Sequence, residues 1–559
     1  MTTKQALLGS AAVLVFAATA WVQTAPGPSE SLSGFLPEGA LLALEARDFS
    51  GSLAAWESSP EKSAWLASDN FQDFSRSKLY LRLQDAQAEF TAAAGLSPDW
   101  NLLRGVAGAE TVVGLYDIGE LRFLYITEIG AARALENALW QSRTNFEPRQ
   151  ASGQTFYVRR DEESGREAAF AAVDDRLILA TSADLAAGAL VLIAEEQTRA
   201  VSAADWYRAA VDNQGARGQL RLVADLQRLT RTPHFRSYWI QNNSSDLRQY
   251  RASVSDLSLT PEGVVESRRL VRLESANPSG ASMVAQLLAQ APPDADLARG
   301  RHAPTPEAAV ALLQEKLLAP PASQYGYAYN PAPYVPADQI ARAAGRLALE
   351  TRIDQPPAQI ARDAFDPAPL LAVSPNLTAV LEVESADAGQ SFTGRRTAVI
   401  LQAASDWDRA AVLAAIRESS SGLWTAAGLG SDWVESGRIA SVSGLRSLHV
   451  RIDGPRLAVS DSRPLLAALS TPAVEAEQDL VYAARFSHAS ARPRYLQTMR
   501  RLDFVSGGGQ PRDQRAPHLF SENIASLSET LARIAAIEVR RYDRGPSVQE
   551  TVLYRWASE

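Results

Sequence analysis

The sequence predicts an α+β protein made of two tandem copies of an antiparallel sheet, each covered by helices on one face, behind one N-terminal transmembrane or signal helix. Three observations predict this fold class. Residues 6–22 form an uncharged apolar run that follows Lys4. Many later segments alternate polar and apolar residues, which places one strand face on a core and the other in water. The order of strands, turns and helices in residues 34–275 also recurs in residues 319–559.

The N-terminal run is expected to hold the protein to a membrane. Ala6–Val22 has 17 residues, and a helix rising about 1.5 Å per residue would span roughly 25 Å, the short limit for a bilayer. An apolar run behind a cation is also the form of a secretory signal, so cleavage after Ala20 is the alternative. Trp21 suits the interface of an uncleaved anchor. We expect residues 1–33 to be a signal anchor and spacer, set in inner-membrane lipid through residues 6–22, with a periplasmic or otherwise extracytoplasmic body.

The first copy, expected over residues 34–275, opens with a strand at Leu41–Arg47. A helix follows, because Asp48 or Ser50 can accept hydrogen bonds from its free N–H groups. Later helices are predicted from apolar residues at i, i+3 and i+4, and strands from alternation. The further expected elements are strands at Leu79–Leu83, Thr111–Tyr116 and Arg122–Glu128, a helix at Ala131–Gln141, strands at Thr155–Arg159, Ala168–Val173 and Leu177–Ala180, a helix at Ala183–Glu195, a strand at Gln219–Ala224 and a hairpin at Ser253–Leu273.

The second copy, expected over residues 319–559, repeats this order. In the clearest match, DDRLILATSADLAAGAL (Asp174–Leu190) and DGPRLAVSDSRPLLAAL (Asp453–Leu469) each give a turn, a strand and a helix. The expected elements are a first strand at Tyr325–Tyr329, a helix at Pro336–Ala344, strands at Arg346–Thr351, Thr378–Glu384 and Thr397–Ala403, a helix at Trp407–Glu418, strands at Leu448–Ile452 and Arg456–Val459, a helix at Arg463–Leu469, a strand at Leu480–Ala484 and a hairpin at Ala535–Trp556.

Residues 276–318 are expected to link the two copies. This stretch is rich in Pro, Gly and Ala and has no periodicity, as is typical of linkers. Ala308–Leu318 within it fits a short helix. One continuous sheet shared by both copies has equal support from the sequence.

The opening of the first copy also resembles a known kind of domain. The residues concerned are LPEGALLALEARDFSGSLAAWESSP (Leu36–Pro60) and GLSPDWNLLRGVAGAETVVGLYD (Gly95–Asp117). They resemble the start of an uncharacterised family of exported, membrane-anchored bacterial domains. The resemblance implies a location in the cell envelope and implies no reaction and no functional residue.

Composition excludes several kinds of site. The chain has no cysteine, which removes thiol nucleophiles, iron–sulfur clusters and disulfides. Its five histidines contain no i, i+4 pair of the kind that binds zinc on a helix. No Gly-x-Ser-x-Gly nucleophile turn occurs, and a net charge of −9 opposes nucleic acid as a main partner. The sequence therefore assigns no catalytic, cofactor-binding or metal-binding residue and no cofactor.

Aromatic side chains are the candidate binding residues, because rigid aromatics are good anchors for a partner and also good core residues. The leading hypothesis is a non-enzymatic, membrane-anchored scaffold that binds an envelope protein, a peptide or a cell-wall component. The alternatives are an envelope hydrolase with a carboxylate site that the sequence does not reveal, and a periplasmic chaperone or assembly factor. The candidate aromatics are Phe235, Tyr238, Trp239, Tyr325, Tyr327, Tyr329 and Tyr334.

Overall fold

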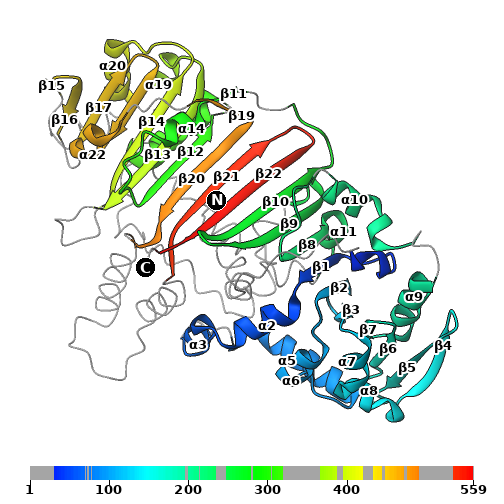
Figure 1. Ribbon diagram of the computed structural model, residues 1–559. Coiled ribbons are helices and arrows are strands. Elements are labelled where there is room, and N and C mark those ends of the chain that lie inside the picture. The colour runs from blue at the N-terminus through cyan, green and yellow to red at the C-terminus, as the bar shows by residue number, and fades with distance from the viewer. Residues whose placement is uncertain are drawn as a thin grey trace, which may run out of the picture. The chain divides into compact units, whose positions relative to one another are not determined.

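The structure is a computed structural model of the 559-residue chain (Figure 1). It describes residues 31–318, 366–491 and 533–557, with gaps at 69–70, 72–74, 77, 195–198, 213, 234–246, 278–280, 304, 387–394, 420–431, 444–446, 471–474 and 490. The expected leader at residues 6–22 lies outside this range. Within the range, no helix combines the length and the hydropathy needed to cross a membrane.

The chain folds into two compact units that do not follow the two halves of the sequence. Unit 1 comprises Met1–Pro278 together with Tyr495–Glu559, and unit 2 comprises Ser279–Arg494. The C-terminal residues thus complete the unit begun by the N-terminal half.

Unit 1 is built on an antiparallel sheet. Its strands are hydrogen-bonded in the order β4–β5–β6–β7–β3–β2–β1–β8–β9–β10–β22–β21. The bounds are β1 Leu42–Arg47, β2 Glu110–Asp117, β3 Arg122–Glu128, β4 Glu147–Ala151, β5 Gln154–Arg160, β6 Glu167–Val173, β7 Arg176–Ala180, β8 Leu220–Asp225, β9 Tyr250–Thr260, β10 Gly263–Arg272, β21 Ile534–Asp543 and β22 Ser547–Trp556.

Helices cover both faces of the part of this sheet from β3 to β7. On one face, Ala169 and Ile178 pack with α9 (Ala183–Ala194) in the largest core cluster. On the other face, Phe170 and Leu177 belong to a second cluster, because successive strand residues point to opposite sides. Residues of α2 Phe49–Glu57, α5 Lys78–Ala94, α6 Trp100–Val106 and α8 Ala138–Gln141 pack in that second cluster, while α7 Ala131–Glu136 contacts β6 and β7 and α3 Pro60–Leu66 contacts α2.

Short helices lie over the first face near β1, β8 and β9. Those that contribute buried residues to the largest core cluster are η1 (Leu32–Phe35), η3 (Val201–Ala203) and α10 (Asp205–Val211). Elsewhere, η2 (Arg143–Asn145) follows α8, and α11 (Leu226–Leu229) packs in a separate cluster with Leu41 and Ala224. Asp48 caps α2 by accepting a hydrogen bond from the Gly51 N–H at 3.1 Å, as predicted.

Unit 2 repeats the plan on a smaller scale. Its strands pair in the order β15–β16–β17–β18–β14–β13–β12–β20, and β11 (Ala281–Ser282) pairs with β19 (Glu477–Gln478). The strands are β12 Leu297–His302, β13 Leu377–Ala386, β14 Arg395–Ala403, β15 Val434–Ser436, β16 Ile439–Val442, β17 Leu448–Asp453, β18 Arg456–Ser460 and β20 Leu480–Ser487. The helices are α14 Val284–Leu288, α15 Pro306–Leu313, η5 Gln314–Leu318, α19 Ala368–Ala372, α20 Arg409–Ser419 and α22 Arg463–Ala468.

The order of elements along the chain is the same in both halves. In the two pairing orders, β1 to β7 of unit 1 correspond one to one, in sequence, to β12 to β18 of unit 2. β8, which pairs with β1, corresponds to β20, which pairs with β12. Each half then ends with a hairpin, β9–β10 or β21–β22. Helices follow the same scheme, with α15 after β12 as α2 follows β1, and α22 after β18 as α9 follows β7.

The expectation of two separate tandem sheets is wrong. β10, from the first half, is hydrogen-bonded to β22, from the second, from Gly263↔Arg555 to Val271↔Ser547. Twenty strands belong to a single antiparallel sheet. The expectation that helices cover only one face of each sheet is also wrong for unit 1, because strands β6 and β7 contribute residues to core clusters on both faces.

Three local expectations need correction as well. Leu79–Leu83 was expected to be a strand and lies in helix α5, which continues into the strong helix formers of QDAQAEFTAAA. Strand β12 lies inside the expected linker 276–318, and the first strand expected at Tyr325–Tyr329 lies outside the described residues. The helix expected at Ala131–Gln141 breaks at Asn137, whose side chain caps α8.

Candidate functional site: a buried ionic network around Glu45

Strand β1 buries a carboxylate where alternation places a solvent-facing residue. The segment LALEAR puts Leu44 and Glu45 on opposite faces. Leu44 is 38% exposed, whereas Glu45 is 1% exposed. Glu45 lies on the face that carries the largest core cluster, beside Ala43. It is therefore a charge inside the core, and its partners decide whether that is tolerable.

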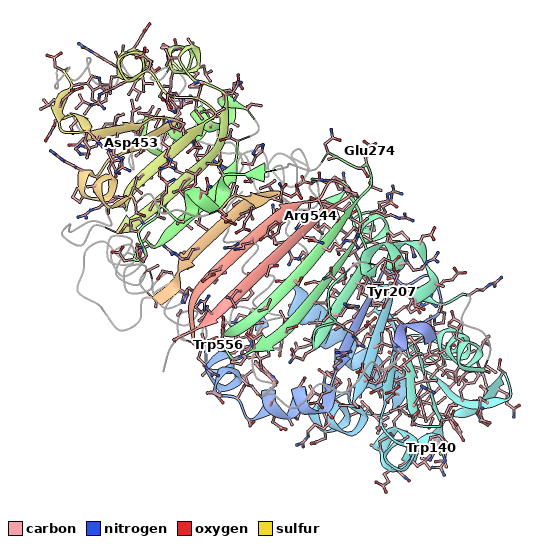
Figure 2. The ribbon with its side chains drawn as sticks, turned by 45° about the horizontal axis from the view of Figure 1, so that its top comes forward. Trp140, Tyr207, Glu274, Asp453, Arg544 and Trp556 are labelled. Atoms are coloured by element: carbon pink, nitrogen blue, oxygen red, sulfur yellow. The ribbon has the colours of Figure 1, made fainter. Side chains whose placement is uncertain are left out.

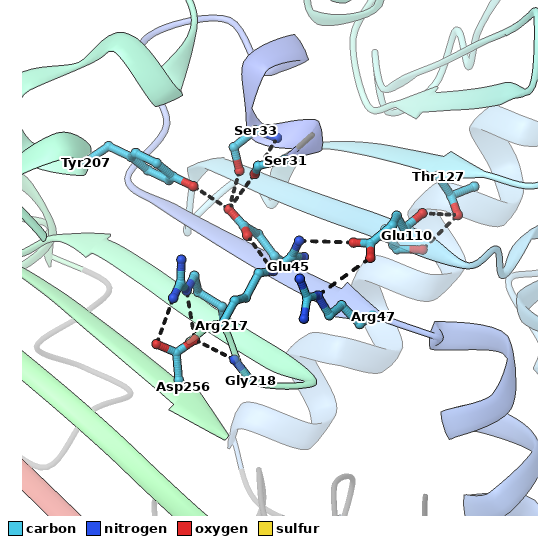
Figure 3. A network of polar contacts seen from close by, with 12 residues as sticks. Ser31, Ser33, Glu45, Arg47, Glu110, Thr127, Tyr207, Arg217, Gly218 and Asp256 are labelled. Carbon is cyan, nitrogen blue, oxygen red and sulfur yellow. Dashed lines mark hydrogen bonds and ion pairs between the residues drawn. The ribbon is translucent and has the colours of Figure 1, made fainter. Parts of the chain in front are cut away.

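One oxygen of Glu45 accepts three hydrogen bonds (Figure 3). The Tyr207 hydroxyl donates to Oε1 at 2.5 Å from helix α10. The hydroxyls of Ser33 and Ser31 donate to the same oxygen at 2.5 and 3.2 Å. These donors come from η1 and α10, far apart in the sequence, so the carboxylate ties both helices to the sheet.

The second oxygen of Glu45 is paired with Arg217. Its Oε2 lies 3.0 Å from Arg217 Nε, and Arg217 Nη1 lies 3.1 Å from Oε2 of Glu110 on β2. Arg47 Nε lies 3.8 Å from the other oxygen of Glu110. Two acids and two guanidinium groups thus form a chain of alternating charge whose net charge is zero.

A further ion pair continues this network across the sheet. The strand register places Glu45 opposite Arg221, and Arg221 opposite Asp256. Arg221 holds Asp256 with two bonds, of 2.7 and 3.0 Å, and the Gly218 N–H donates to the same carboxylate at 3.1 Å. Asp256 is 2% exposed, so this bidentate pair is also part of the interior.

Burial and the neighbouring carboxylate both act on Tyr207. Desolvation, followed by the charge of Glu45 and the hydrogen bond to it, raises the pKa of the Tyr207 phenol well above its usual range. The hydroxyl therefore remains a proton donor to Glu45 at physiological pH. A group held in this way acts as a structural donor and cannot act as a general base near neutrality.

Unit 2 contains a second buried network, on different elements. Glu382 on β13 is 1% exposed and accepts from Arg299 Nη2 of β12 at 2.6 Å. Lys316 Nζ lies 2.8 Å from its other oxygen. Burial raises the pKa of Glu382, but the bonds and charges of Lys316 and Arg299 outweigh it and hold the pKa below its usual value.

A third network lies on the β10–β22 ladder of unit 1. Glu266 on β10 and Glu550 on β22 are both buried, and Arg268 reaches them at 2.5 and 3.4 Å. Arg541 lies 2.6 Å from Glu550. The middle pair of this ladder is Ser267 with Thr551. Glu266 directly precedes Ser267, and Glu550 directly precedes Thr551. Figure 2 shows the β21–β22 hairpin that carries Glu550, with Arg544 at its turn and Trp556 at the far end of β22.

The seven candidate aromatics cannot be placed as a site. Phe235, Tyr238 and Trp239, and the four tyrosines between 325 and 334, all lie outside the described residues. The structure instead shows a shallow depression of about 750 Å³ in unit 2, lined among others by Arg409, Leu413, Arg417, Trp433 and Glu435. Within the residues described, no group of three or more His, Asp or Glu side chains is arranged to hold a metal ion.

Sequence reasoning missed all three ionic networks. Their members are scattered, as with Glu45 and Tyr207, which are 162 residues apart. The one available signal was the pair of charged residues Glu45 and Arg47 in the strand LALEAR, but an alternating strand gives the same pattern when its polar face meets water.

Known protein families, curated proteins and solved structures do not identify a function for this chain. No family model matches the chain, and no curated protein matches it. Solved structures of TP0453 in crystal forms IV and III share 9% identity with the chain at a TM-score of 0.22, covering 44% of it and 81% of their own length. Crystal form I gives a TM-score of 0.20 over 79% of its length. Likenesses this remote transfer neither fold nor function to this chain.

Proposed function

We propose that this protein is a membrane-anchored, extracytoplasmic scaffold that binds an envelope protein, a peptide or a cell-wall component and performs no chemistry of its own. The apolar run at residues 6–22 supports the anchor. The buried carboxylates of the described residues are all bonded to other groups of the protein, which supports a protein without catalytic activity. The proposal depends on this observation.

Every buried carboxylate in the described part of the chain is already engaged. Six of the seven are ion-paired, and Asp225 caps α11 by accepting from the Arg228 N–H at 3.1 Å. A catalytic acid or nucleophile must instead reach a substrate. The six ion-paired acids are Glu45, Glu110, Asp256, Glu266, Glu382 and Glu550.

The alternative of a carboxylate hydrolase fits these networks poorly. Glu45 and Glu110 are the most suggestive pair, since both bind Arg217. A glycosidase needs its two carboxyl groups to flank a substrate in a cleft. Here a guanidinium group occupies the space between them, and Glu45 is 1% exposed. Opening the site would leave buried charges without partners, which is strongly unfavourable.

The anchor is tested with the full-length chain in a bacterial host. We expect carbonate-washed membranes to retain it, and protease added to spheroplasts to degrade the body. Recovery of the intact chain in the cytosol would contradict the proposal.

Binding is tested by placing a photo-crosslinking amino acid, one position at a time, at the exposed residues Leu44, Leu135 and Val434. We expect a discrete adduct at a subset of these positions and none from the fully buried control position Leu124. The absence of adducts at all exposed positions would count against a binding scaffold. Hydrolysis of cell-wall material that Glu45→Gln abolishes while unit 1 stays folded would favour the hydrolase instead.

A further inference from the structure

Strand β10 receives the C-terminal hairpin of the chain, with β22 as its direct partner (Figure 1). Nine residue pairs join the two strands, and Ser267↔Thr551 is the middle pair. On its other side, β10 pairs with β9 of its own hairpin. Displacement of the C-terminal hairpin would therefore leave one long edge of β10 with unpaired N–H and C=O groups, and such an edge is a template for another strand.

The two strands of this ladder resemble each other about its middle pair. Glu266 and Ser267 of β10 align with Glu550 and Thr551 of β22. Under that alignment, each residue of β10 pairs with the counterpart of the residue that lies equally far on the other side of Ser267. β22 thus lies where a second β10 would lie if a two-fold axis passed through the middle pair. Two-fold axes of this kind relate identical subunits in isologous interfaces.

The sequence of β10 also complements itself about Ser267. In a β10–β10 pair with Ser267 opposite its own copy, Glu266 would face Arg268 twice, and Val264 would face Leu270 twice. Opposite charges and apolar side chains placed directly across an antiparallel pair stabilise it. The β10–β22 ladder has one pair of opposite charges directly across it, Arg268 with Glu550. A second copy of β10 would therefore offer one more charged pair than β22 does.

Contacts of the hairpin itself keep this edge occupied. Val552 and Tyr554 of β22 pack with Val264 in one apolar cluster. Arg272 of β10 holds Asp543 of β21 with two hydrogen bonds, of 2.5 and 2.7 Å. The hairpin is tethered to the same chain, so its effective concentration at β10 far exceeds that of a second copy in dilute solution. In the intact chain, the β21–β22 hairpin therefore acts as a cap on β10.

We propose that β10 is a docking edge for a second copy of this chain, and that the β21–β22 hairpin is an intramolecular cap that blocks it. Displacing the cap would let two chains join by β10–β10 pairing around a two-fold axis at Ser267. The inference goes beyond the proposed scaffold and does not depend on its membrane anchor. It makes the oligomeric state of the protein switchable through its last hairpin.

The experiment places a reporter at the proposed two-fold axis, in the full-length chain solubilised in a mild detergent. Because the chain has no cysteine, Ser267→Cys gives a single thiol, and two such thiols meet when two copies pair β10 with β10 in this register. Thr551→Pro removes an N–H of β22 without changing β10 and so displaces the cap. At high protein concentration and under mild oxidation, we expect several-fold more disulfide-linked dimer from the chain with both substitutions than from Ser267→Cys alone.

Charge exchange tests the complementarity of β10. Added to the chain with both substitutions, Arg268→Glu sets like charges across a β10–β10 pair and should abolish the dimer. Adding Glu266→Arg as well restores opposite charges and should recover the dimer. The matched control is the same exchange on the exposed strand β4, Glu147→Arg/Arg149→Glu, which should leave the amount of dimer unchanged.

Hydrogen exchange in β22 shows whether the cap has been displaced. If β22 stays protected, Val552→Asp/Tyr554→Asp replaces the proline, because it brings charge into the apolar cluster. With the cap displaced, a chain that stays monomeric would overturn the inference. A dimer without the disulfide at position 267 would also overturn it, since the two copies would then meet at another surface or exchange their hairpins. Equal cross-linking in all charge variants would show that association does not depend on the sequence of β10.

Discussion

Glu45 and Leu44 show that whether a strand side chain is buried depends on what covers the face of the sheet to which it points. The carboxylate is 1% exposed while its apolar neighbour is 38% exposed. Desolvating a carboxylate costs several kcal/mol even after relaxation, on the order of what a small domain gains in folding. Tyr207, Ser33 and Arg217 offset this cost together, so each of them is needed.

The first prediction concerns the charge of Glu45. Glu45→Gln keeps the shape but leaves Arg217 shared with Glu110 alone, and we expect unit 1 to lose about 3–5 kcal/mol of unfolding free energy. Denaturant unfolding followed by hydrogen exchange in β1 and β8 measures this. The matched control is Glu147→Gln on strand β4, which breaks an exposed pair with Arg149 and should leave the unfolding midpoint unchanged. Equal effects of the two substitutions would refute the buried network.

The second prediction concerns the hydroxyl of Tyr207. Tyr207→Phe removes the donor that lies 2.5 Å from Glu45, and losing a hydrogen bond to a charged group costs about 1.5–3 kcal/mol. Tyr157→Phe, at an aromatic position in the other core of the same unit, is the control for the loss of a hydroxyl. Because Tyr207 keeps its proton well above neutral pH, we expect the loss to be the same at pH 6 and pH 8. A loss that differs between these two pH values would contradict this.

The third prediction is the acid sensitivity of unit 2. The folded state holds the pKa of Glu382 below its value in the unfolded chain. A depressed carboxyl pKa stabilises the fold above the unfolded value of about 4.5, and that stability is lost as the pH falls through the folded pKa. We expect protection of β13 and β14 from hydrogen exchange to fall as the pH drops below about 4.5, and to fall less steeply in Glu382→Gln. If the protection of β13 and β14 fell equally steeply with pH in both proteins, Glu382 would be excluded as the cause of the acid sensitivity.

At the scale of elements, local pattern predicted some segments well and others not at all. β3 begins and ends where its alternation predicts, and α9 begins at the predicted residue. Leu79–Leu83 alternates as a strand does, yet it belongs to a 17-residue helix. Period-two alternation over five residues is too short to outweigh the helix formers that follow it. β12 was missed because it lies in a stretch rich in Pro, Gly and Ala that predicted a linker. In the structure, Arg299 of this strand is paired with a buried acid.

The ionic networks could not be predicted, for a related reason. Sequence patterns report neighbours along one element, and each network joins elements that only the pairing order brings together. Arg268 reaches Glu550 across 282 residues, and Arg299 reaches Glu382 across 83. The repeated order of elements could be read from the sequence, but which strands would meet at the end of each half could not.

The fourth prediction tests the ladder between β10 and β22. Thr551 is exposed and pairs with Ser267 on one side and Arg540 on the other. Thr551→Pro removes an N–H from an interior strand, and a proline there costs about 3 kcal/mol or more. We expect hydrogen exchange to accelerate in β10, β21 and β22, while Thr551→Val, which keeps the N–H and a branched side chain, leaves it unchanged. Unaltered exchange in β10 of the proline variant would contradict the observed pairing.

At the scale of the whole molecule, one strand order recurs in both halves, and the last hairpin of the second half, β21–β22, pairs with β10 in the unit that the first half builds. The second half keeps β12 to β20 in its own unit and contributes β21 and β22 to unit 1. The apolar cluster on these strands includes residues from both halves, such as Val264 and Tyr554. Unit 1 is thus incomplete without the end of the chain, although unit 2 is continuous in sequence.

The fifth prediction follows from that asymmetry. A chain ending after Arg494 keeps every described residue of unit 2 and lacks β21 and β22. β10 then becomes a long unpaired edge, and Val264 and Leu257 lose the cover of Val552 and Tyr554. Exposed apolar edge strands promote association, so we expect the truncated chain to aggregate or to lose protection in β9 and β10. Strands β13 and β14 of the same molecule serve as the internal control and should keep their protection. If β9 and β10 remained as protected as in the full chain, the last hairpin would be an accessory to unit 1 and not one of its structural strands.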